Sequence, residues 1–270
     1  MNGEFAGRTA LVTGGSRGIG RAVAAALARA GARVAINYRG DETSALETRA
    51  LVEVMHGAAI HGAAARGATT RSAAAGSVAA LFRADVADPA QVAEMIAGIE
   101  ASLGPVDLLV TSAGVSVFES HERMTPETWR KTMAVNVDGT AWPILAVKDG
   151  MLERRYGRIV CLSSIGGLRP RENQIAYTAS KAAVIAMVRS FAAALGPIVR
   201  VNAVAPGPTE TDMMKSLLTE MGPERLAALP LGRMAAPEEV AEIVLFLLSD
   251  RSALLTGQTL VASGGEVMLP

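Results

Sequence analysis

Tyr177 and Lys181 stand four residues apart in the stretch YTASK. On a helix, residues at this spacing project from the same face, so the phenol and the ammonium would be neighbours. A free tyrosine has a pKa of about 10, and a nearby positive charge stabilises the phenolate and lowers that pKa. Such a phenol can protonate a forming alkoxide or deprotonate an alcohol. Ordinary surface pairs share this spacing, so the pattern gains weight from the residues that accompany it.

A glycine-rich stretch, TGGSRGIG at 13–20, follows an apolar run. Gly14, Gly18 and Gly20 allow a tight turn and let the backbone approach a ligand closely. A helix that begins near Gly18 would point its free N–H groups and positive dipole end at an anion such as a pyrophosphate. The spacing G-x-x-x-G-x-G differs from the common G-x-G-x-x-G pattern, and a plain strand-to-helix turn is the alternative.

The residues after the second apolar run bear on which dinucleotide would bind. An acidic residue at this position would bind the adenosine ribose and repel a 2′-phosphate, but the chain has Asn37, Tyr38 and Arg39. Arg17 lies in the glycine-rich turn, and arginine makes charge-assisted contacts with phosphate. Two guanidiniums and no carboxylate at this corner favour NADP(H) over NAD(H). The alternative is that Arg39 is a solvated loop charge.

Short apolar runs recur along the chain and predict seven strands, at 9–13, 33–37, 81–85, 107–112, 158–163, 200–205 and 259–263. Between most of them the apolar residues follow helical spacing, most clearly over 89–103 and 177–195. Nearly continuous apolar strands that alternate with helices are typical of a parallel sheet covered on both faces. Right-handed crossovers then predict one doubly wound, Rossmann-like α/β domain over residues 1–270.

Residues 56–77 depart from this alternation, because they are rich in Ala and Gly and have no clear period. We expect a solvated insertion, or an extended helix followed by a loop, rather than a functional element. His56 and His61 lie five apart in this segment without a cysteine or carboxylate beside them, so the sequence predicts no metal site.

The overall composition excludes several classes of protein. Twenty-six basic residues balance 26 acidic ones, so no net charge attracts nucleic acid or a membrane surface. Cys161 is the single cysteine, which rules out an internal disulfide. The first residues lack the pattern of a signal peptide, and no apolar stretch reaches the roughly 18 residues that span a bilayer. We therefore expect a soluble cytoplasmic protein.

Eight ordered motifs resemble the short-chain dehydrogenase/reductase family. They are TGGSRGIG at 13–20, DV at 85–86, AG at 113–114, VNVDG at 135–139, SS at 163–164, YTASK at 177–181, NAVAPGPTETDM at 202–213 and TGQTLVASGG at 256–265. The resemblance runs from about residue 8 to about residue 265 and is interrupted chiefly by 56–77. The whole pattern is most similar to the 3-oxoacyl-[acyl-carrier-protein] reductase branch.

The resemblance implies four catalytic residues. Tyr177 is expected to be the general acid/base, and Lys181 to lower its pKa and hold the nicotinamide ribose. Ser164 would bond the substrate carbonyl oxygen, with Ser163 as the other candidate, one residue out of register. Asn136 would keep a water in a proton relay from Lys181. Its alternative is a satisfied amide inside a helix.

The resemblance also implies a set of dinucleotide contacts. Asp85 would accept from the adenine amino group beside Val86, whereas helix capping is expected of Asp88. The Thr209 backbone would meet the carboxamide, and Thr211 would donate to the pyrophosphate. The full predicted cofactor-binding set is Gly14, Ser16, Arg17, Gly18, Ile19, Gly20, Asn37, Arg39, Asp85, Val86, Gly114, Tyr177, Lys181, Pro206, Gly207, Thr209 and Thr211.

Residues 208–235 are expected to form a mobile lid over the substrate. Within it, Met213, Met214, Leu217 and Leu218 either face a ligand or pack in the core.

The polar loop 167–174 carries two arginines that suit either of two interpretations. Arg169 and Arg171 either contact a phosphopantetheine or an acidic carrier, or are solvated charges. Ser112 stands where the family commonly has an asparagine, which leaves the hydrogen bonding around that strand open.

The sequence as a whole predicts an NADP(H)-dependent oxidoreductase that reduces a ketone or 3-oxoacyl group to a secondary alcohol. An NAD(H)-dependent alcohol, sugar or steroid dehydrogenase is the alternative within the family. A cofactor-binding sensor or assembly protein is the alternative of another class. The family further implies a homotetramer in which the helices around 126–153 and 177–195 pack across subunits.

Overall fold

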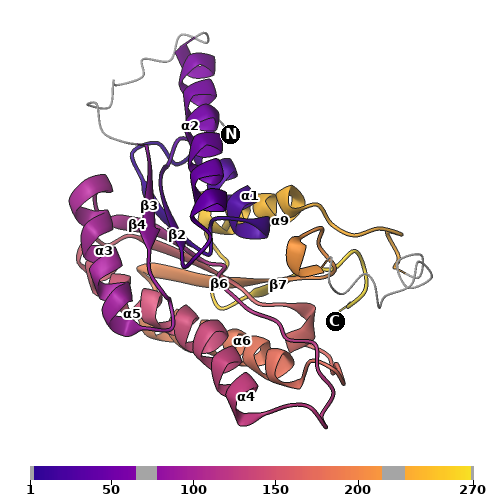
Figure 1. The fold of residues 1–270 in the computed structure, drawn as a ribbon. Coiled ribbons are helices and arrows are strands. Elements are labelled where there is room, and N and C mark those ends of the chain that lie inside the picture. The colour runs from indigo at the N-terminus through magenta and orange to yellow at the C-terminus, as the bar shows by residue number, and fades with distance from the viewer. Residues whose placement is uncertain (1–2, 65–77, 215–228, 269–270) are drawn as a thin grey trace.

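The computed structural model describes residues 3–64, 78–214 and 229–268, and these build a seven-stranded sheet (Figure 1). The strand order is β3-β2-β1-β4-β5-β6-β7, and every neighbouring pair is parallel. All seven predicted strands are present. Their bounds are β1 Thr9–Thr13, β2 Arg33–Tyr38, β3 Ala79–Arg83, β4 Val106–Thr111, β5 Gly157–Leu162, β6 Val199–Pro206 and β7 Thr259–Ala262.

The helices alternate with the strands as the apolar spacing predicts. The long ones are α1 Gly18–Arg29, α2 Glu42–Ala64, α3 Pro89–Leu103, α5 Gly139–Glu153, α6 Ile175–Leu195 and α9 Pro237–Leu248. The shorter ones are α4 Pro126–Met133, the π-helical turn η1 Ala134–Asp138, and the 3-10 turns η2 Ile165–Gly167 and η3 Asp250–Ser252. Helix α3 begins where predicted, because the Asp88 side chain accepts from the N–H groups of Ala90 and Gln91.

Side chains that alternate along each strand build one apolar core on each face of the sheet. In β1, Val12 belongs to the core beneath α1 and α9, whereas Leu11 belongs to the core beneath α3, α5 and α6. Figure 1 shows the same division, with α1, α2 and α9 on one side of the sheet and α3, α5 and α6 on the other. Since both faces are buried, most residues in the strands are apolar, as predicted.

The strand order places a crevice at one edge of the sheet. The chain moves outward from β1 through β2 to β3, then returns to the other side of β1 with β4. The loops after β1 and β4 therefore leave in opposite directions. Ligands of doubly wound proteins bind at such a switch point, outside the carboxyl ends of the strands.

Two predicted segments are described only in part. Helix α2 continues to Ala64, so the beginning of the 56–77 segment is helical, as the second alternative predicts. Residues 65–77, and residues 215–228 of the expected lid with Leu217 and Leu218, lie outside the described residues.

Among the described helices, α6 is the one whose length and composition would suit a membrane span. Its buried residues, including Val184 and Val188, are part of the core on one face of the sheet. Core helices of globular proteins commonly meet the same criteria.

The glycine-rich turn is packed too tightly for a side chain at two positions. A Cβ on Gly20 would lie 2.3 Å from the carbonyl oxygen of Gly14. Gly14 itself has a φ of +61°, and its Cβ would lie 2.7 Å from Cα of Ala113, which follows β4. These contacts hold the turn, the first residues of α1 and the end of β4 together.

We expect Gly20→Ala to lower the free energy of unfolding by about 2 kcal/mol, because the added methyl group must displace backbone. Gly57→Ala is the matched control, since a Cβ at that position in α2 meets nothing within 4 Å. The control should be neutral or slightly stabilising, because alanine is the better helix former. Urea denaturation of both variants checks this. Equal stability of the two would show that the turn is looser than described.

Candidate active site

A cavity of about 640 Å³ opens at the carboxyl ends of the strands, where the topology predicts a ligand site. Its volume lies within the range of small-molecule and cofactor sites. The predicted residues that line it are Gly14, Ser16, Arg17, Gly18, Ile19, Gly20, Asn37, Arg39, Asp85, Val86, Gly114, Tyr177, Lys181, Pro206 and Thr211. The predicted residues outside its lining are Asn136, Ser164, Gly207 and Thr209.

The start of α1 at this cavity suits an anion. Arg17 occupies the N-cap position with extended backbone, and its side chain makes no capping hydrogen bond. The first turn of the helix contains no acidic residue. Its N–H groups therefore end at the cavity with glycines around them, which is the arrangement that binds a phosphate at a helix N-terminus. The residues present thus fit a dinucleotide pyrophosphate.

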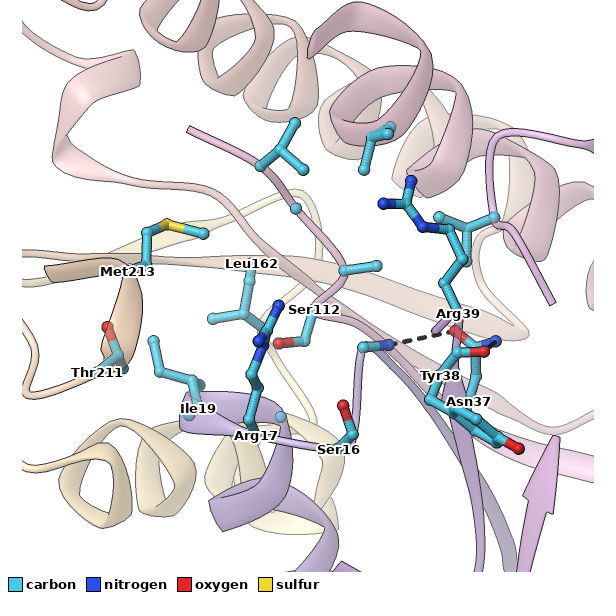
Figure 2. Close-up of a pocket in the computed structure, with 18 of the residues that line it drawn as sticks. Ser16, Arg17, Ile19, Asn37, Tyr38, Arg39, Ser112, Leu162, Thr211 and Met213 are labelled. Carbon is cyan, nitrogen blue, oxygen red and sulfur yellow. Dashed lines mark hydrogen bonds between the residues drawn. The ribbon is translucent and has the colours of Figure 1, made fainter. Parts of the chain in front are cut away.

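Asn37 lines the cavity but directs its amide into the protein. Its Oδ1 accepts from the N–H of Gly14 at 3.2 Å, and its Nδ2 donates to the carbonyls of Phe82 and Ala84 at 3.2 and 3.1 Å. Figure 2 shows this side chain at the end of β2 with its bond to the turn dashed. The side chain is only 2% exposed. Asn37 therefore joins the glycine-rich turn to β3, and its amide is not available to a ribose.

The corner beside Asn37 contains two carboxylates as well as two guanidiniums, which corrects the prediction of a corner without a carboxylate. Arg17 Nη1 lies 3.9 Å from Asp41 Oδ2, and Arg39 Nη1 lies 3.6 Å from Asp85 Oδ2. All four residues line the cavity. In Figure 2, Arg17 rises from the turn before α1 and Arg39 from the end of β2. The Arg39 side chain is 58% exposed, so the pair with Asp85 leaves it a largely solvated charge, in agreement with the alternative interpretation.

Tyr177 and Lys181 line the same cavity, as their spacing on α6 predicts. Lys181 Nζ lies 5.8 Å from the centroid of the Tyr177 ring and donates to the carbonyl oxygen of Leu162 at 2.8 Å. Lys181 is only 6% exposed, and desolvation lowers its pKa to about 8. The lysine is thus a buried cation held in place by one main-chain carbonyl.

Burial raises the pKa of Tyr177 above its ordinary value of 10, against the opposing effects of a hydrogen bond with Ser164 and the charge of Arg171. The prediction that Lys181 lowers this pKa is not what the structure shows. The Lys181 ammonium donates to the Leu162 carbonyl and lies 5.8 Å from the centroid of the phenol ring, and its charge is not among the causes of the Tyr177 shift. Desolvation by the surrounding protein therefore determines the direction of the shift, and the phenol is protonated at neutral pH.

The structure separates the two adjacent serines by their partners. Ser163 Oγ donates to the main-chain carbonyl of Lys181 at 2.9 Å and is buried there. Ser164 Oγ accepts from the N–H of Gly166 at 3.0 Å and is hydrogen-bonded with Tyr177. A Cβ on Gly166 would lie 3.3 Å from the Tyr177 ring and 3.4 Å from Ser164 Oγ, so this glycine lets the two groups meet. Ser163 lines the cavity and Ser164 lies outside its lining, but the hydrogen bond with Tyr177 favours Ser164 as the serine beside the phenol.

Asn136 has a fully hydrogen-bonded amide, which is the alternative that the sequence left open for it. It lies in η1, where its Oδ1 accepts from Val115 N at 2.8 Å and its Nδ2 donates to Val115 O and Ser180 Oγ, both at 2.9 Å. A Cβ on Gly114 would lie 3.4 Å from Asn136 Oδ1 and 3.6 Å from Lys181 Nζ. The bare Gly114 backbone therefore leaves a small gap between the amide oxygen and the buried ammonium.

The segment after β6 reaches the cavity with only some of its predicted residues. Thr211 and Met213 line the cavity, and Met213 is 44% exposed. Thr209 is buried and its Oγ1 donates to the carbonyl of Gly207 at 3.1 Å. A Cβ on Gly207 would lie 2.8 Å from Cα of Ser263, so Gly207 packs against the end of β7 behind the cavity. Met213 thus faces the cavity, while Gly207 and Thr209 support the segment from behind.

Arg169 and Arg171 are partly buried rather than solvated. Both form ion pairs with Glu266, the latter at 3.5 Å, and Glu266 is 8% exposed. Arg171 also lies close enough to Tyr177 to lower its pKa. The C-terminal segment thereby joins the loop before α6, a connection that the sequence does not reveal because the partners are 95 residues apart.

Several cavity residues were missed by the sequence analysis, among them Asp41, Ser116 and Val135. Asp41 precedes the start of α2 at Glu42, and its capping position was the one local signal that marked it. Ser112, also in the lining, keeps its N–H bonded to Thr13 Oγ1 at 3.1 Å, so the main chain after β4 is anchored without an asparagine there.

Two family models match this chain. The model described as short chain dehydrogenase covers residues 8–65, and the one described as Enoyl-(Acyl carrier protein) reductase covers residues 56–266. Acetoacetyl-CoA reductase of Shinella zoogloeoides is 35% identical over 96% of this chain and 98% of its own length. The 3-oxoacyl-[acyl-carrier-protein] reductase FabG of Escherichia coli is 35% identical over 98% of this chain and 100% of its own.

A solved structure is similar to this chain over nearly its whole length. The 3-oxoacyl-[acyl-carrier protein] reductase from Brucella melitensis has a TM-score of 0.84 and 31% sequence identity. The alignment covers 99% of this chain and 94% of that one. The similarity therefore extends over the whole doubly wound sheet.

The buried charge of Lys181 predicts a pH-dependent difference in stability between the wild type and Lys181→Met. The pKa of Lys181 is about 8 in the fold against an ordinary 10.5, so between these values the unfolded chain binds more protons. Stability of the wild type relative to the variant should therefore rise with pH through this window. We expect a rise of about 2 kcal/mol between pH 7 and pH 10. Denaturation curves of both proteins at several pH values measure this rise. A stability difference that does not change with pH would show that the pKa of Lys181 is not lowered in the fold.

Proposed function

Because this chain belongs to the short-chain dehydrogenase/reductase family and is of the FabG-like type, we propose that it reduces a ketone or 3-oxoacyl group with NADP(H), using Tyr177 as general acid. The observation that carries the proposal is the meeting of Tyr177, Ser164 and Lys181 beside one cavity. The named activities of the relatives support the class of substrate.

A bound nicotinamide would supply the hydride, and the protein's part is to orient the carbonyl and deliver the proton. Burial keeps the Tyr177 phenol protonated at neutral pH, which suits a proton donor to the forming alkoxide. Ser164 accepts from Gly166 N–H, so its own hydroxyl hydrogen remains to be donated to the phenol or to the substrate oxygen. Together the two hydroxyls would stabilise the charge that develops on that oxygen.

Lys181 and Asn136 would bind the nicotinamide ribose and resupply the proton. Lys181, anchored on the Leu162 carbonyl, keeps two further N–H donors that would bind the ribose hydroxyls. With a pKa of about 8 it is mostly charged at neutral pH and can still exchange a proton. Asn136 Oδ1 accepts one bond, from Val115 N–H, and with its second lone pair it would hold a water in the gap beside Gly114 and so relay a proton to Lys181.

The preference for NADP(H) rests on Arg17 and Arg39. Both guanidiniums line the cavity beyond the end of β2, where the 2′-phosphate of an adenosine ribose would lie. A homotetramer and a cytoplasmic location stay predictions. Exposed apolar side chains on the expected contact helices, Trp129 on α4 and Leu145 on α5, are what such an assembly would cover.

The direct test is turnover of NADPH by the purified protein with a panel of ketones that includes acetoacetyl-CoA. We expect reduction of at least one 3-oxoacyl thioester, and a loss of at least about 100-fold in kcat for Tyr177→Phe, which removes only the acidic hydroxyl. Tight cofactor binding without turnover on any ketone would favour the sensor alternative. Undiminished turnover by Tyr177→Phe would remove the general-acid assignment.

The adjacent serines provide a matched pair of hydroxyl deletions. Ser164→Ala should lower kcat by about 100-fold, as loss of one oxyanion donor does. Ser163→Ala removes the bond to the Lys181 carbonyl and should mainly lower stability, by about 1 kcal/mol. Steady-state kinetics and thermal denaturation of both variants separate the two effects. A larger loss of kcat in Ser163→Ala would reverse the assignment.

A further inference from the structure

Asp41 is an acidic residue that forms an ion pair with Arg17 at the end of the cavity where the proposed function places the adenosine. Its Oδ2 lies 3.9 Å from Arg17 Nη1, and both residues belong to the cavity lining. Arg17 comes from the turn before α1 and Asp41 from the loop after β2. The pair therefore spans the corner in which a ribose 2′-substituent would lie under the proposed function.

The start of α2 holds the Asp41 carboxylate in place. The N–H of Ser44 donates to Oδ1 at 3.0 Å, so one oxygen caps the helix while the other faces Arg17. The two bonds from Ser44, and to a smaller extent the Arg17 charge, hold the pKa of Asp41 below its ordinary value. The carboxylate is therefore ionised at neutral pH and cannot turn away without losing the cap.

We propose that Asp41 is an internal counter-ion that competes with the 2′-phosphate of NADP(H) for Arg17 and thereby sets the cofactor selectivity of this chain. The inference rests on the proposed function. A bound 2′-phosphate must displace the carboxylate from the guanidinium and is repelled by it. A ribose 2′-hydroxyl, in contrast, can donate to the same oxygen. Asp41 thus lowers the affinity for NADP(H) and does not lower the affinity for NAD(H).

The exposure of the pair indicates how large the effect is. The side chains of Arg17 and Asp41 are 63% and 42% exposed. Exposed ion pairs are weak and are screened by salt, so a phosphate can displace the carboxylate at a modest loss of affinity. Asp85 lies in a similar way beside Arg39, but it is also the expected adenine contact, so Asp41 is the cleaner position to vary.

The test is isothermal titration of wild type and Asp41→Asn with NADP⁺ and NAD⁺, and with the fragments 2′,5′-ADP and ADP. Asparagine caps a helix as well as aspartate does, so the variant should keep α2. We expect the Kd of NADP⁺ and of 2′,5′-ADP to fall by about threefold at low salt. The Kd of NAD⁺ and of ADP should stay the same or rise.

Asp88→Asn is the matched control. Asp88 also caps a helix, α3, through two N–H groups, and it lies outside the cavity lining. The Asp88→Asn substitution removes the same charge from the protein. The ratio of its Kd for NADP⁺ to its Kd for NAD⁺ should therefore equal the ratio of the wild type. If Asp41→Asn gives the wild-type ratio too, the inference is overturned while the proposed function stands.

A double variant distinguishes pairing from general charge. In an Arg17→Gln background, Asp41→Asn should change the NADP⁺ Kd no more than Asp88→Asn does, because the contested guanidinium is gone. An undiminished threefold effect in that background would overturn the competition for Arg17. Failure of the wild type to bind either dinucleotide would instead overturn the proposed function, and the inference with it.

Discussion

Burial of both faces of the parallel sheet is the constraint on which the other features depend. Since Leu11 and Val12, adjacent on β1, belong to cores on opposite faces, each face must be covered by helices. The chain then has to cross from one strand to the next over those helices, and every loop at the carboxyl edge meets its neighbours there. The cavity is formed by these loops at a single edge, which is why residues from 14 to 213 share one site.

Tyr177 and Lys181, the two side chains proposed to transfer protons, are both desolvated by the surrounding protein. Lys181 is buried with its ammonium on the Leu162 carbonyl, and burial acts on the pKa of Lys181 and of Tyr177 in opposite directions. The ordinary pKa values, 10.5 for lysine and 10.0 for tyrosine, are close together, so lowering the first to about 8 and raising the second moves the two pKa values apart. Desolvation therefore keeps the proton on the Tyr177 phenol at neutral pH, whereas the Lys181 ammonium begins to release its proton near pH 8.

Charge compensation recurs around the cavity at both ends. Arg17 and Arg39 have Asp41 and Asp85 at the end of the cavity beyond β2, and Arg171 has Glu266 at the end beside Tyr177. Each pair joins segments that come from different strands, so the pairs also tie the loops to one another. A charged ligand entering such a site exchanges partners with groups already there, so its affinity depends on the acidic residues as much as on the arginines.

The sequence by itself determined the strands and the side of α6 that carries Tyr177 and Lys181. Seven apolar runs became seven strands, and the spacing of Tyr177 and Lys181 placed both on one side of α6, because these features depend on local periodicity. The tertiary structure decided which partner each polar group has. The Asn37 amide turned inward to β3, Ser163 bonded to the backbone of α6 and left Ser164 to the phenol, and the guanidiniums met carboxylates. Such pairings depend on side-chain direction and on contacts between distant segments, and no local pattern in the chain encodes them.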